Sequence, residues 1–195
     1  MTLRICTIDP CTRPAERCAG SYMLCAQHLC TAHLQLEHHT CLTRDTEPYA
    51  FFKTYGAAKN KYLSALLAKV VVAALQRIAS QARDGVSCTI PALAQDVDDE
   101  TRLARVSEQF GGQNAHVDFC FEDGVTWLTR LRPDDSLLPP AAVRKRVIES
   151  GVATLEFLER TKMPALKVYA WSSSSSDIGT PYVLMEKLSG RPLDW

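Results

Sequence analysis

The chain has 195 residues, of which 46% are hydrophobic, and its 22 basic side chains are balanced by 22 acidic ones. This composition is typical of a soluble globular protein, and the length suits one domain of ordinary size with a small satellite. The even charge balance, without a basic stripe, argues against a nucleic-acid-binding protein.

The N-terminal segment is rich in potential metal ligands. Six of the eight cysteines and four of the five histidines lie within the first 41 residues. Thiolate and imidazole are the preferred ligands of structural zinc, which takes four of them in a tetrahedron. A short interval such as that between Cys30 and His33 lets one turn present two ligands to the same ion. We therefore predict that residues 1–44 form a zinc-binding module with one zinc ion or two.

The spacing of these ligands resembles that of the AN-one-type zinc finger, which occurs in stress-associated, ubiquitin-linked proteins. The match is closest in the segment Cys25-x4-Cys30-x2-His33-x5-His39-x-Cys41. The resemblance implies that one ion is held by Cys6, Cys11, Cys30 and His33. It implies a second site that contains Cys25, His39 and Cys41. The family's fourth ligand, just before Cys25, has no counterpart here, so either Cys18 completes the second site or that site is three-coordinate or weak.

The same cysteines have two other interpretations, disulfides in a secreted domain and reduced thiols without a ligand. The first six residues contain no apolar signal-peptide core, and disulfides would leave the clustered histidines unexplained. We therefore predict a cytoplasmic protein with reduced thiolates, in which His28 and His38 are surface residues. A protein partner that binds through the zinc module is one further expectation.

Residues 45–100 are predicted to form a linker followed by an amphipathic helix. Apolar residues recur there at three- and four-residue intervals, as on one face of a helix: Leu63, Leu66, Leu67, Val70, Val71, Ala74, Leu75 and Ile78. We expect this stripe to be buried in the protein's own core, with a partner-binding helix as the alternative. The longest unbroken apolar run, residues 70–75, is far shorter than the ~20 residues that span a bilayer, so no membrane segment is predicted.

The stretch after this helix has little pattern. Residues 91–100 are acidic, and the consecutive carboxylates Asp98, Asp99 and Glu100 cannot all point inward, so a solvated turn is expected. Cys88 and Cys120 lie far from the N-terminal cluster, and we predict that both are buried as small apolar residues.

Residues 115–131 change to a period of two, which is typical of strands. Ala115, Val117, Phe119 and Phe121 alternate with polar residues, and Asp123-Gly124 follows, a dipeptide favoured in two-residue type I′ turns. We therefore predict a β-hairpin that ends before Pro133.

A helix begins after Pro139 and Pro140, with an apolar face made by Val143, Val147, Ile148, Val152, Leu155 and Leu158. Residues 166–171 and 181–188 read as strands, joined by a serine-rich loop. The fold class is therefore α+β.

Two segments of this C-terminal part resemble the aminoglycoside phosphotransferase family, whose fold is that of protein kinases. Residues 161–168, TKMPALKV, are similar to the family's T-x-(I/V)-P-x-P-K-V passage from helix to strand. Residues 181–193, PYVLMEKLSGRPL, are similar to its (P/F)-Y-(I/V)-L-M-E-x-(I/L)-x-G-x-x-L segment. These segments are most similar to those of the family's fungal members, in which an arginine often replaces the strand-three lysine. The resemblance covers about residues 110–195 and implies that residues 101–195 form the small, ATP-binding lobe, an antiparallel sheet with a helix.

The resemblance also implies a set of nucleotide-binding positions. The turn that covers the phosphates, between the first two strands, would contain Gly111 and Gly112, because glycines let backbone N–H groups approach phosphate oxygens. Arg130 takes the strand-three position that reaches the α- and β-phosphates, with Arg132 on the same strand face as the fallback. The hinge, whose backbone would bind adenine, would consist of Met185, Glu186 and Lys187. ATP with Mg²⁺ is thus the cofactor that the family implies.

The chain departs from the family pattern at two places. The helix glutamate that pairs with the strand-three cation aligns with Gly151, and Glu149 lies about 200° away around the helix. The catalytic H-x-D-x-x-x-x-N loop and the metal-binding Asp-x-Asp have no counterpart, since no histidine follows His116. Phosphoryl transfer needs these groups, so no catalytic residue is assigned. We expect the chain to be a member or fragment of a family of ATP-dependent small-molecule kinases that does not catalyse transfer as written. The alternative is a zinc-dependent protein-interaction module on a degenerate kinase scaffold.

Overall fold

The computed structural model describes residues 5–15, 24, 27–35, 38, 47–111, 114–133, 140–161 and 163–188. The described chain has an α+β fold with four α-helices and one five-stranded sheet. It divides into two compact units, one made of Met1–Ala65 and Asp135–Arg144 and the other of Leu66–Asp134 and Lys145–Trp195. The sheet lies entirely in the second unit.

The sheet is antiparallel throughout, with the strand order β1-β2-β3-β5-β4. Its strands are β1 (Cys88–Thr89), β2 (Ala115–Phe121), β3 (Thr126–Leu131), β4 (Val168–Ser172) and β5 (Tyr182–Glu186). The hairpin of β2 and β3 is paired from Ala115 with Leu131 to Cys120 with Thr126. The predicted hairpin and the two later strands are therefore confirmed, and β1 is an edge strand that the sequence did not reveal.

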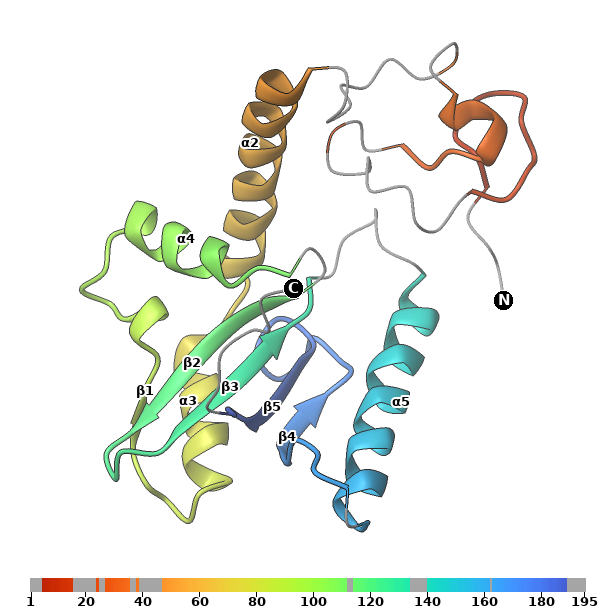
Figure 1. Cartoon of the computed structure of the whole chain (residues 1–195). Helices are drawn as coiled ribbons and strands as arrows, with labels where there is room; N and C mark the ends of the chain where they lie inside the picture. Colours follow the sequence, from red (N-terminus) through yellow and green to blue (C-terminus); the bar gives the residue numbers. More distant parts are fainter. Residues whose placement is uncertain are drawn as a thin grey trace. The chain divides into compact units, whose positions relative to one another are not determined.

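Helices cover both faces of this sheet (Figure 1). On one face, Ile148 and Val152 of α5 (Ala141–Glu159) pack against Val183 and Met185 of β5. Alternate residues of β2 and β3 point to the opposite face, where α3 (Val72–Gln81) lies behind the sheet in Figure 1. The side chains buried there include Val117, Phe119, Trp127 and Leu131. Burial of each large apolar side chain contributes about 1.5–3 kcal/mol, so this layer is the main core.

The predicted single helix through residues 63–78 is wrong, because the chain breaks between α2 (Pro48–Leu67) and α3. At the break, the backbone N–H of Val71 donates to the carbonyl of Ile178 at 3.0 Å instead of continuing the helix. The apolar stripe is buried at Leu66, Ala74 and Leu75, while Val71 is 51% exposed. The predicted burial of the stripe is therefore confirmed on both sides of the break, but it is wrong for Val71, at the break itself.

The hairpin turn also differs from the predicted two-residue type I′ turn. A type I′ turn needs a positive φ at both central residues, and here Gly124 has φ +81 whereas Asp123 does not. The N–H of Phe121 donates to the carbonyl of Val125 at 2.9 Å, and the N–H of Gly124 donates to the carbonyl of Phe121 at 3.0 Å. The connection is thus a three-residue loop that ends in a left-handed glycine, the next most common hairpin type.

The acidic stretch before residue 100 is exposed at Asp98, Asp99 and Glu100, as expected, but it contains more than a turn. It forms a short 3-10 helix, Pro91–Leu93, and then α4 (Asp99–Glu108). Asp98 is the N-cap of α4, since its carboxylate accepts from the backbone N–H of Thr101 at 2.9 Å and from the Thr101 hydroxyl at 2.6 Å. These hydrogen bonds lower the pKa of Asp98. The carboxylates are therefore at a helix N-terminus, where negative charge is favourable.

Cys88 and Cys120 are half-buried rather than buried. The Cys88 thiol lies 3.6 Å from the carbonyl of Gln76 in α3, and burial raises the pKa of this thiol.

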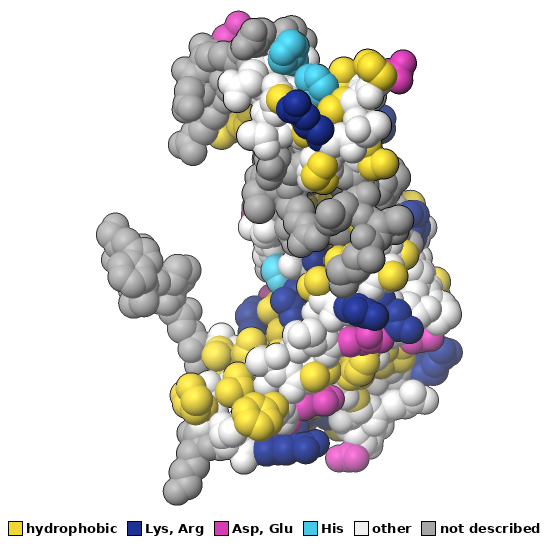
Figure 2. Space-filling view, turned by 90° about the vertical axis from the view of Figure 1, so that its right-hand side faces the viewer, with side chains coloured by type: hydrophobic (Ala, Val, Ile, Leu, Met, Phe, Trp, Pro, Cys, Tyr) yellow, Lys and Arg dark blue, Asp and Glu magenta, His cyan; other side chains and the backbone are white. Residues whose placement is uncertain are grey.

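No single helix in the described residues is both long and apolar enough to cross a membrane; α2 and α3 meet that test only when they are joined as a bent pair. On the face of Figure 2, acidic and basic side chains are interspersed rather than gathered into one patch.

An ion pair joins the turn of the hairpin to the segment that follows α3, and it should make stability depend on pH. Both Nε and Nη2 of Arg83 donate to Oδ2 of Asp123, at 3.0 and 2.6 Å. This contact with Arg83 lowers the pKa of Asp123. A carboxyl group whose pKa is depressed in the folded state contributes stability above its unfolded pKa, near ~4, and loses that contribution as the pH falls through the lower folded value.

We therefore expect Asp123→Asn to make the free energy of unfolding depend less on pH in the acidic range. The urea midpoint of the parent should fall more steeply than that of the variant between about pH 5 and about pH 2. The amide oxygen of asparagine can still accept the turn hydrogen bond from Val125, so the change isolates the charge. Asp96→Asn, at an exposed position, is the matched control. Parallel profiles for the parent and Asp123→Asn would contradict the linkage.

Candidate functional site

The first candidate site is a cluster of thiols and an imidazole in the first unit. One ligand atom each from Cys6, Cys11, Cys30 and His33 lies within 4.8 Å of the other three. Sγ of Cys11 is 3.8 Å from Sγ of Cys30, and Nδ1 of His33 is 3.1 Å from Sγ of Cys6 and 3.6 Å from Sγ of Cys30. A tetrahedral zinc ion with Zn–S bonds of about 2.3 Å holds its sulfur ligands about 3.8 Å apart. The four groups therefore lie close enough to hold a metal ion and are compatible with zinc.

Backbone hydrogen bonds hold these four residues on a small scaffold. The N–H of Cys6 donates to the carbonyl of Arg13 at 2.9 Å, and Ile5 bridges Pro14 in an antiparallel pair. The N–H of Thr7 donates to the carbonyl of His28 at 2.7 Å, which ties this loop to the approach to Cys30. A 3-10 turn, Thr31–Leu34, then places His33 beside Cys30. The buried apolar cluster of this scaffold is small, with Cys6, Leu29 and Cys30 at its centre, so a bound ion would supply a large share of its stability.

The cluster is enclosed on its cysteine side. Cys6 and Cys30 are 6% and 3% exposed, and they pack with Leu29. The backbone N–H of His33 lowers the pKa of Cys30, which favours the thiolate form that binds metals. The neighbouring Cys11 differs: a backbone hydrogen bond with Arg13 lowers the pKa of this thiol, but burial and Cys30 outweigh it and leave the value raised. Two thiols in contact cannot both ionise readily without a cation between them.

The structure thus brings together four of the eight predicted metal ligands. The other four, Cys18, Cys25, His39 and Cys41, lie outside the described residues. His38 is exposed, and its ring meets the ring of His33 edge-on, with the centroids 5.3 Å apart. His28 is partly buried and contributes its carbonyl to the scaffold.

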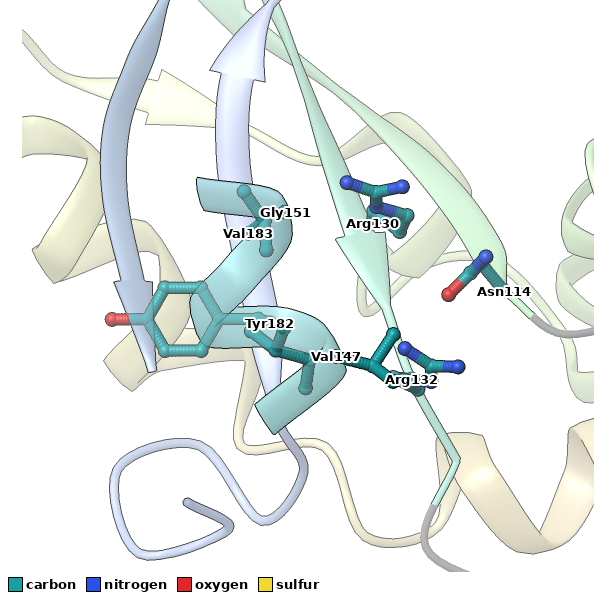
Figure 3. A pocket seen from close by; sticks show the side chains of 8 residues that line it. Asn114, Arg130, Arg132, Val147, Gly151, Tyr182 and Val183 are labelled. Carbon is teal, nitrogen blue, oxygen red and sulfur yellow. The ribbon is translucent and has the colours of Figure 1, made fainter. Parts of the chain in front are cut away.

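The second candidate site is a cavity of about 200 Å³ in the second unit, between β3 and α5 (Figure 3). Its polar lining comes from Asn114, Arg130 and Arg132, and the remaining lining residues are Val147, Ile148, Gly151, Tyr182 and Val183. Both arginines belong to the same face of the β3 strand line, two residues apart, so their Cα atoms are roughly 7 Å apart. Figure 3 shows the two arginines and Asn114 on one side of the space and α5 on the other.

The cavity has a positive lining. No acidic side chain is among the described residues that border it. The carboxylate of Asp118, on the same strand face of β2, forms a 2.7 Å ion pair with Lys187. Glu149 of α5 accepts from the hydroxyl of Ser173 at 3.3 Å and lies 3.7 Å from Nζ of Lys145. The arrangement can therefore attract an anion, and each of these two carboxylates has a partner that does not line the cavity.

The predicted nucleotide residues are only partly gathered here. Arg130 and its fallback Arg132 both line the cavity, and so does Gly151. The segment with Gly111 follows α4 and enters β2, so it does not connect two full strands as predicted; a single antiparallel bridge, Phe110 with Ala115, flanks it. The N–H of Gly111 donates to the carbonyl of Asn114 at 3.0 Å. Gly112 lies outside the described residues.

The predicted hinge forms the end of β5. Met185 is 4% exposed in the apolar cluster under α5. The backbone N–H of Glu186 donates to the carbonyl of Lys167 at 2.8 Å, so this donor is already used within the protein. The side chain of Lys187 is held by Asp118. None of the three lines the described cavity.

Asn114 is the cavity residue that sequence reasoning overlooked. A lone amide directly before a predicted strand has no specific signature, so the sequence gives no reason to assign it a role. Val147 was expected on the buried face of its helix, yet it is 49% exposed at the cavity rim.

Comparisons with known proteins give one partial likeness. No family model matches the chain, and no curated protein matches it. A solved structure from Ralstonia eutropha JMP134, of a protein inferred to be an aminoglycoside phosphotransferase, is similar with 29% sequence identity and a TM-score of 0.31. The match covers 44% of this chain and 22% of that one, so it spans about a fifth of that protein's length.

Proposed function

We propose that the second unit is the nucleotide-binding lobe of a protein related to the aminoglycoside phosphotransferases. The observation that carries the proposal is the cavity between β3 and α5. The motif alignment assigns Arg130 to the phosphate-binding position and Gly151 to the helix position opposite it, and both residues line this cavity. These two residues are 21 positions apart in sequence, and their presence in the lining of one cavity supports the proposal.

In this proposal, the arginine of β3 supplies positive charge to the phosphates of a nucleotide. A guanidinium group presents several N–H donors in a fixed fork and keeps its charge at all physiological pH values, which suits phosphate oxygens. Mg²⁺, which accompanies the nucleotide in this family, would be held by the nucleotide's own phosphates on this side of the site. The acceptor of any phosphoryl group would be a small molecule.

The first unit adds a zinc-binding module to this lobe. The donor set of three cysteines and one histidine is a common structural zinc set, and the four ligand atoms lie close enough together for one ion. Such a site stabilises its own small fold and exposes a surface around it. This feature supports the second candidate function, a zinc-dependent module that binds another protein.

Titration calorimetry with magnesium-ATP tests the nucleotide proposal. We expect a dissociation constant on the order of 1 mM, about 4 kcal/mol of binding free energy, because an open site leaves the phosphates in water, where charge attraction is weak. Arg130→Ala should weaken this binding by roughly tenfold or more. Arg77→Ala, which removes an exposed arginine from α3, should not change it.

Two results would contradict the nucleotide proposal. One is a parent protein that gives no heat with magnesium-ATP at several millimolar, and the other is an equal affinity in the parent and in Arg130→Ala. Magnesium tripolyphosphate, measured in parallel, separates the contribution of the phosphates from that of the base. If zinc removal abolishes capture of a protein partner while nucleotide binding is absent, the interaction function is favoured instead.

A further inference from the structure

We propose that the exposed side of α2 binds the surface of an anionic lipid bilayer. This surface, the α2 face, consists of Tyr49, Phe52, Lys53 and Lys61, all of which are exposed. Around the helix, Tyr49 and Lys53 lie about 40° apart, and Phe52 and Lys61 flank them on opposite sides. The contact is peripheral, with the helix on the headgroups rather than across the membrane. It involves the first unit and does not depend on a nucleotide.

The first argument is charge. Residues 48–83 contain no aspartate or glutamate, although the whole chain has 22. The neutral total therefore conceals a local positive excess, and α2 itself carries three lysines and no acidic residue. Lys53 and Lys61 form no ion pair with any residue in the described part of the chain. Anionic lipids attract such side chains, and each lysine near the bilayer surface increases the affinity by roughly fivefold.

The second argument is the exposure of aromatic rings. Tyr49 is 83% exposed and Phe52 is 53% exposed, both near the start of α2. The ring of Phe52 meets the ring of Phe51 edge-on, with centroids 5.5 Å apart, and Phe51 stacks on Tyr55. Phe52 is therefore supported by neighbouring rings while about half of its surface stays in water. Aromatic side chains are enriched at membrane interfaces, where a ring can enter the headgroup layer.

The third argument is the change in burial along the helix. The later turns of α2 are fixed in the protein, since Leu63 and Leu66 are 0% and 3% exposed. Phe52 lies on nearly the same stripe as Leu63, within about 20° around the helix, yet it is exposed. The apolar stripe thus continues beyond the part that the protein buries, and its first turns are available to a ligand.

The composition of the α2 face favours lipid over protein or nucleic acid. The other exposed positions between Lys53 and the end of the helix include Ala57, Asn60 and Ser64, and protein interfaces are depleted in lysine, alanine and serine. Nucleic-acid sites prefer arginine, whose fork of donors matches a phosphate, and α2 contains none. Lysine is a point charge on a flexible stem, which suits the diffuse field of a layer of headgroups. The outside of a single helix is also convex, and a deformable lipid surface needs no matching pocket.

Cosedimentation of the full chain with vesicles tests the proposal. One set of vesicles consists of phosphatidylcholine alone, and the other of phosphatidylcholine and phosphatidylserine in a ratio of roughly two to one. We expect the parent to bind the anionic vesicles at least about tenfold more tightly than the neutral ones. This preference should decline when the salt concentration is raised from about 0.1 M to about 0.5 M, because salt screens the exposed charges.

Two double variants separate the contributions of charge and aromatic rings. Lys53→Gln with Lys61→Gln should weaken binding to anionic vesicles by roughly tenfold or more. Tyr49→Ser with Phe52→Ser should weaken it by at least about fivefold, because binding scales with the apolar area that enters the interface. All four positions are exposed, so far-ultraviolet circular dichroism and the melting temperature should stay close to those of the parent.

Matched controls come from exposed positions of α5. Arg146→Gln removes one exposed cation, and Phe157→Ser removes a ring that is 66% exposed. Neither residue belongs to the α2 face, so neither change should alter binding to vesicles.

The proposal is overturned if the parent binds anionic and neutral vesicles equally, or if the double lysine variant binds like Arg146→Gln. It is also overturned if the double aromatic variant binds like Phe157→Ser, since adsorption would then depend on charge alone. Polyuridylate, measured in parallel, represents a nucleic acid. Binding of this polymer with the same dependence on Lys53 and Lys61, without binding to vesicles, would make nucleic acid the ligand and contradict the lipid proposal.

Discussion

We expect Cys30→Ser to abolish tight zinc binding and to unfold the scaffold around the cluster, residues 5–15 and 27–35. Cys30 is the central ligand of the four, since its sulfur contacts both Cys11 and His33. Its side chain is also the most buried of the three cysteines in the cluster. Zinc binding free energy in such small modules is on the order of 10 kcal/mol, and it serves as folding free energy. Serine keeps the size but lacks the thiolate, so the ion should be lost with the fold.

Elemental analysis after mild chelation measures the first part of this expectation. The parent should retain close to one zinc ion per chain, and Cys30→Ser should retain none from this cluster. Amide spectra measure the second part, since only signals from the scaffold should collapse to random-coil positions. Cys88→Ser is the matched control, because Cys88 lies in β1, outside the cluster. A parent that is folded and metal-free over the described part of residues 5–35 would show that zinc is not the organising element.

The hairpin and the last strands could be predicted because their signals are local. Alternation from Ala115 to Phe121 makes a face whose members are nearly fully buried, and the strongly apolar run that begins at Tyr182 forms β5. The predicted helix after Pro140 begins at Ala141, as proline at a helix start indicates. In each case, the pattern is set by residues within one segment and does not depend on contacts with distant parts of the chain.

The break between α2 and α3 could not be predicted from periodicity. The apolar stripe continues in register through the break, and what interrupts the helix is the carbonyl of Ile178, more than 100 residues later in the chain. One local signal existed: Val70, Val71 and Val72 are consecutive β-branched residues, which form helices poorly. Similarly, the two-residue β1 depends on pairing with Cys120 and Phe121 rather than on a pattern of its own.

The two candidate sites also differ in how far local sequence signals could predict them. Metal ligands were recognisable because thiol and imidazole groups at short intervals have few other uses, and the structure places Cys6, Cys11, Cys30 and His33 together. For the cavity, the sequence motifs marked only some of the lining residues. The motifs mark Arg130 by its charge and Gly151 by the missing glutamate, but they do not indicate that Asn114 and Tyr182 border the same space.

We expect Gly179→Ala to destabilise the second unit by about 3 kcal/mol or more, one of the largest effects of any single methyl group in the chain. Gly179 has φ +83, and a Cβ atom there would lie 1.8 Å from the carbonyl oxygen of Lys69 and 2.8 Å from its carbonyl carbon. Both atoms are backbone, so the contact cannot be relieved by a change of rotamer. The loop before β5 would have to move away from the break between α2 and α3.

That movement would disrupt several buried groups at once. The neighbouring carbonyl of Ile178 would lose its 3.0 Å bond from the N–H of Val71, and the fully buried Ile178 side chain would be displaced. Thr180, also fully buried, would lose its 2.6 Å hydrogen bond to the carbonyl of Arg132. Gly124→Ala is the matched control, since Gly124 has φ +81 but its Cβ would meet nothing within 4 Å. It should cost only the ~1 kcal/mol of a left-handed alanine.

Thermal unfolding followed by near-ultraviolet circular dichroism measures the difference, because Trp127 and Tyr169 are stacked in the second unit, with ring centroids 3.7 Å apart, and report on its packing. For a chain of this size, 3 kcal/mol corresponds to a fall in melting temperature of roughly 10 °C, and 1 kcal/mol to about 3 °C. Equal losses in the two variants would mean that backbone conformation alone makes glycine necessary at residue 179. A much larger loss in Gly179→Ala would show that the close approach of the Lys69 carbonyl holds the helix break against the sheet.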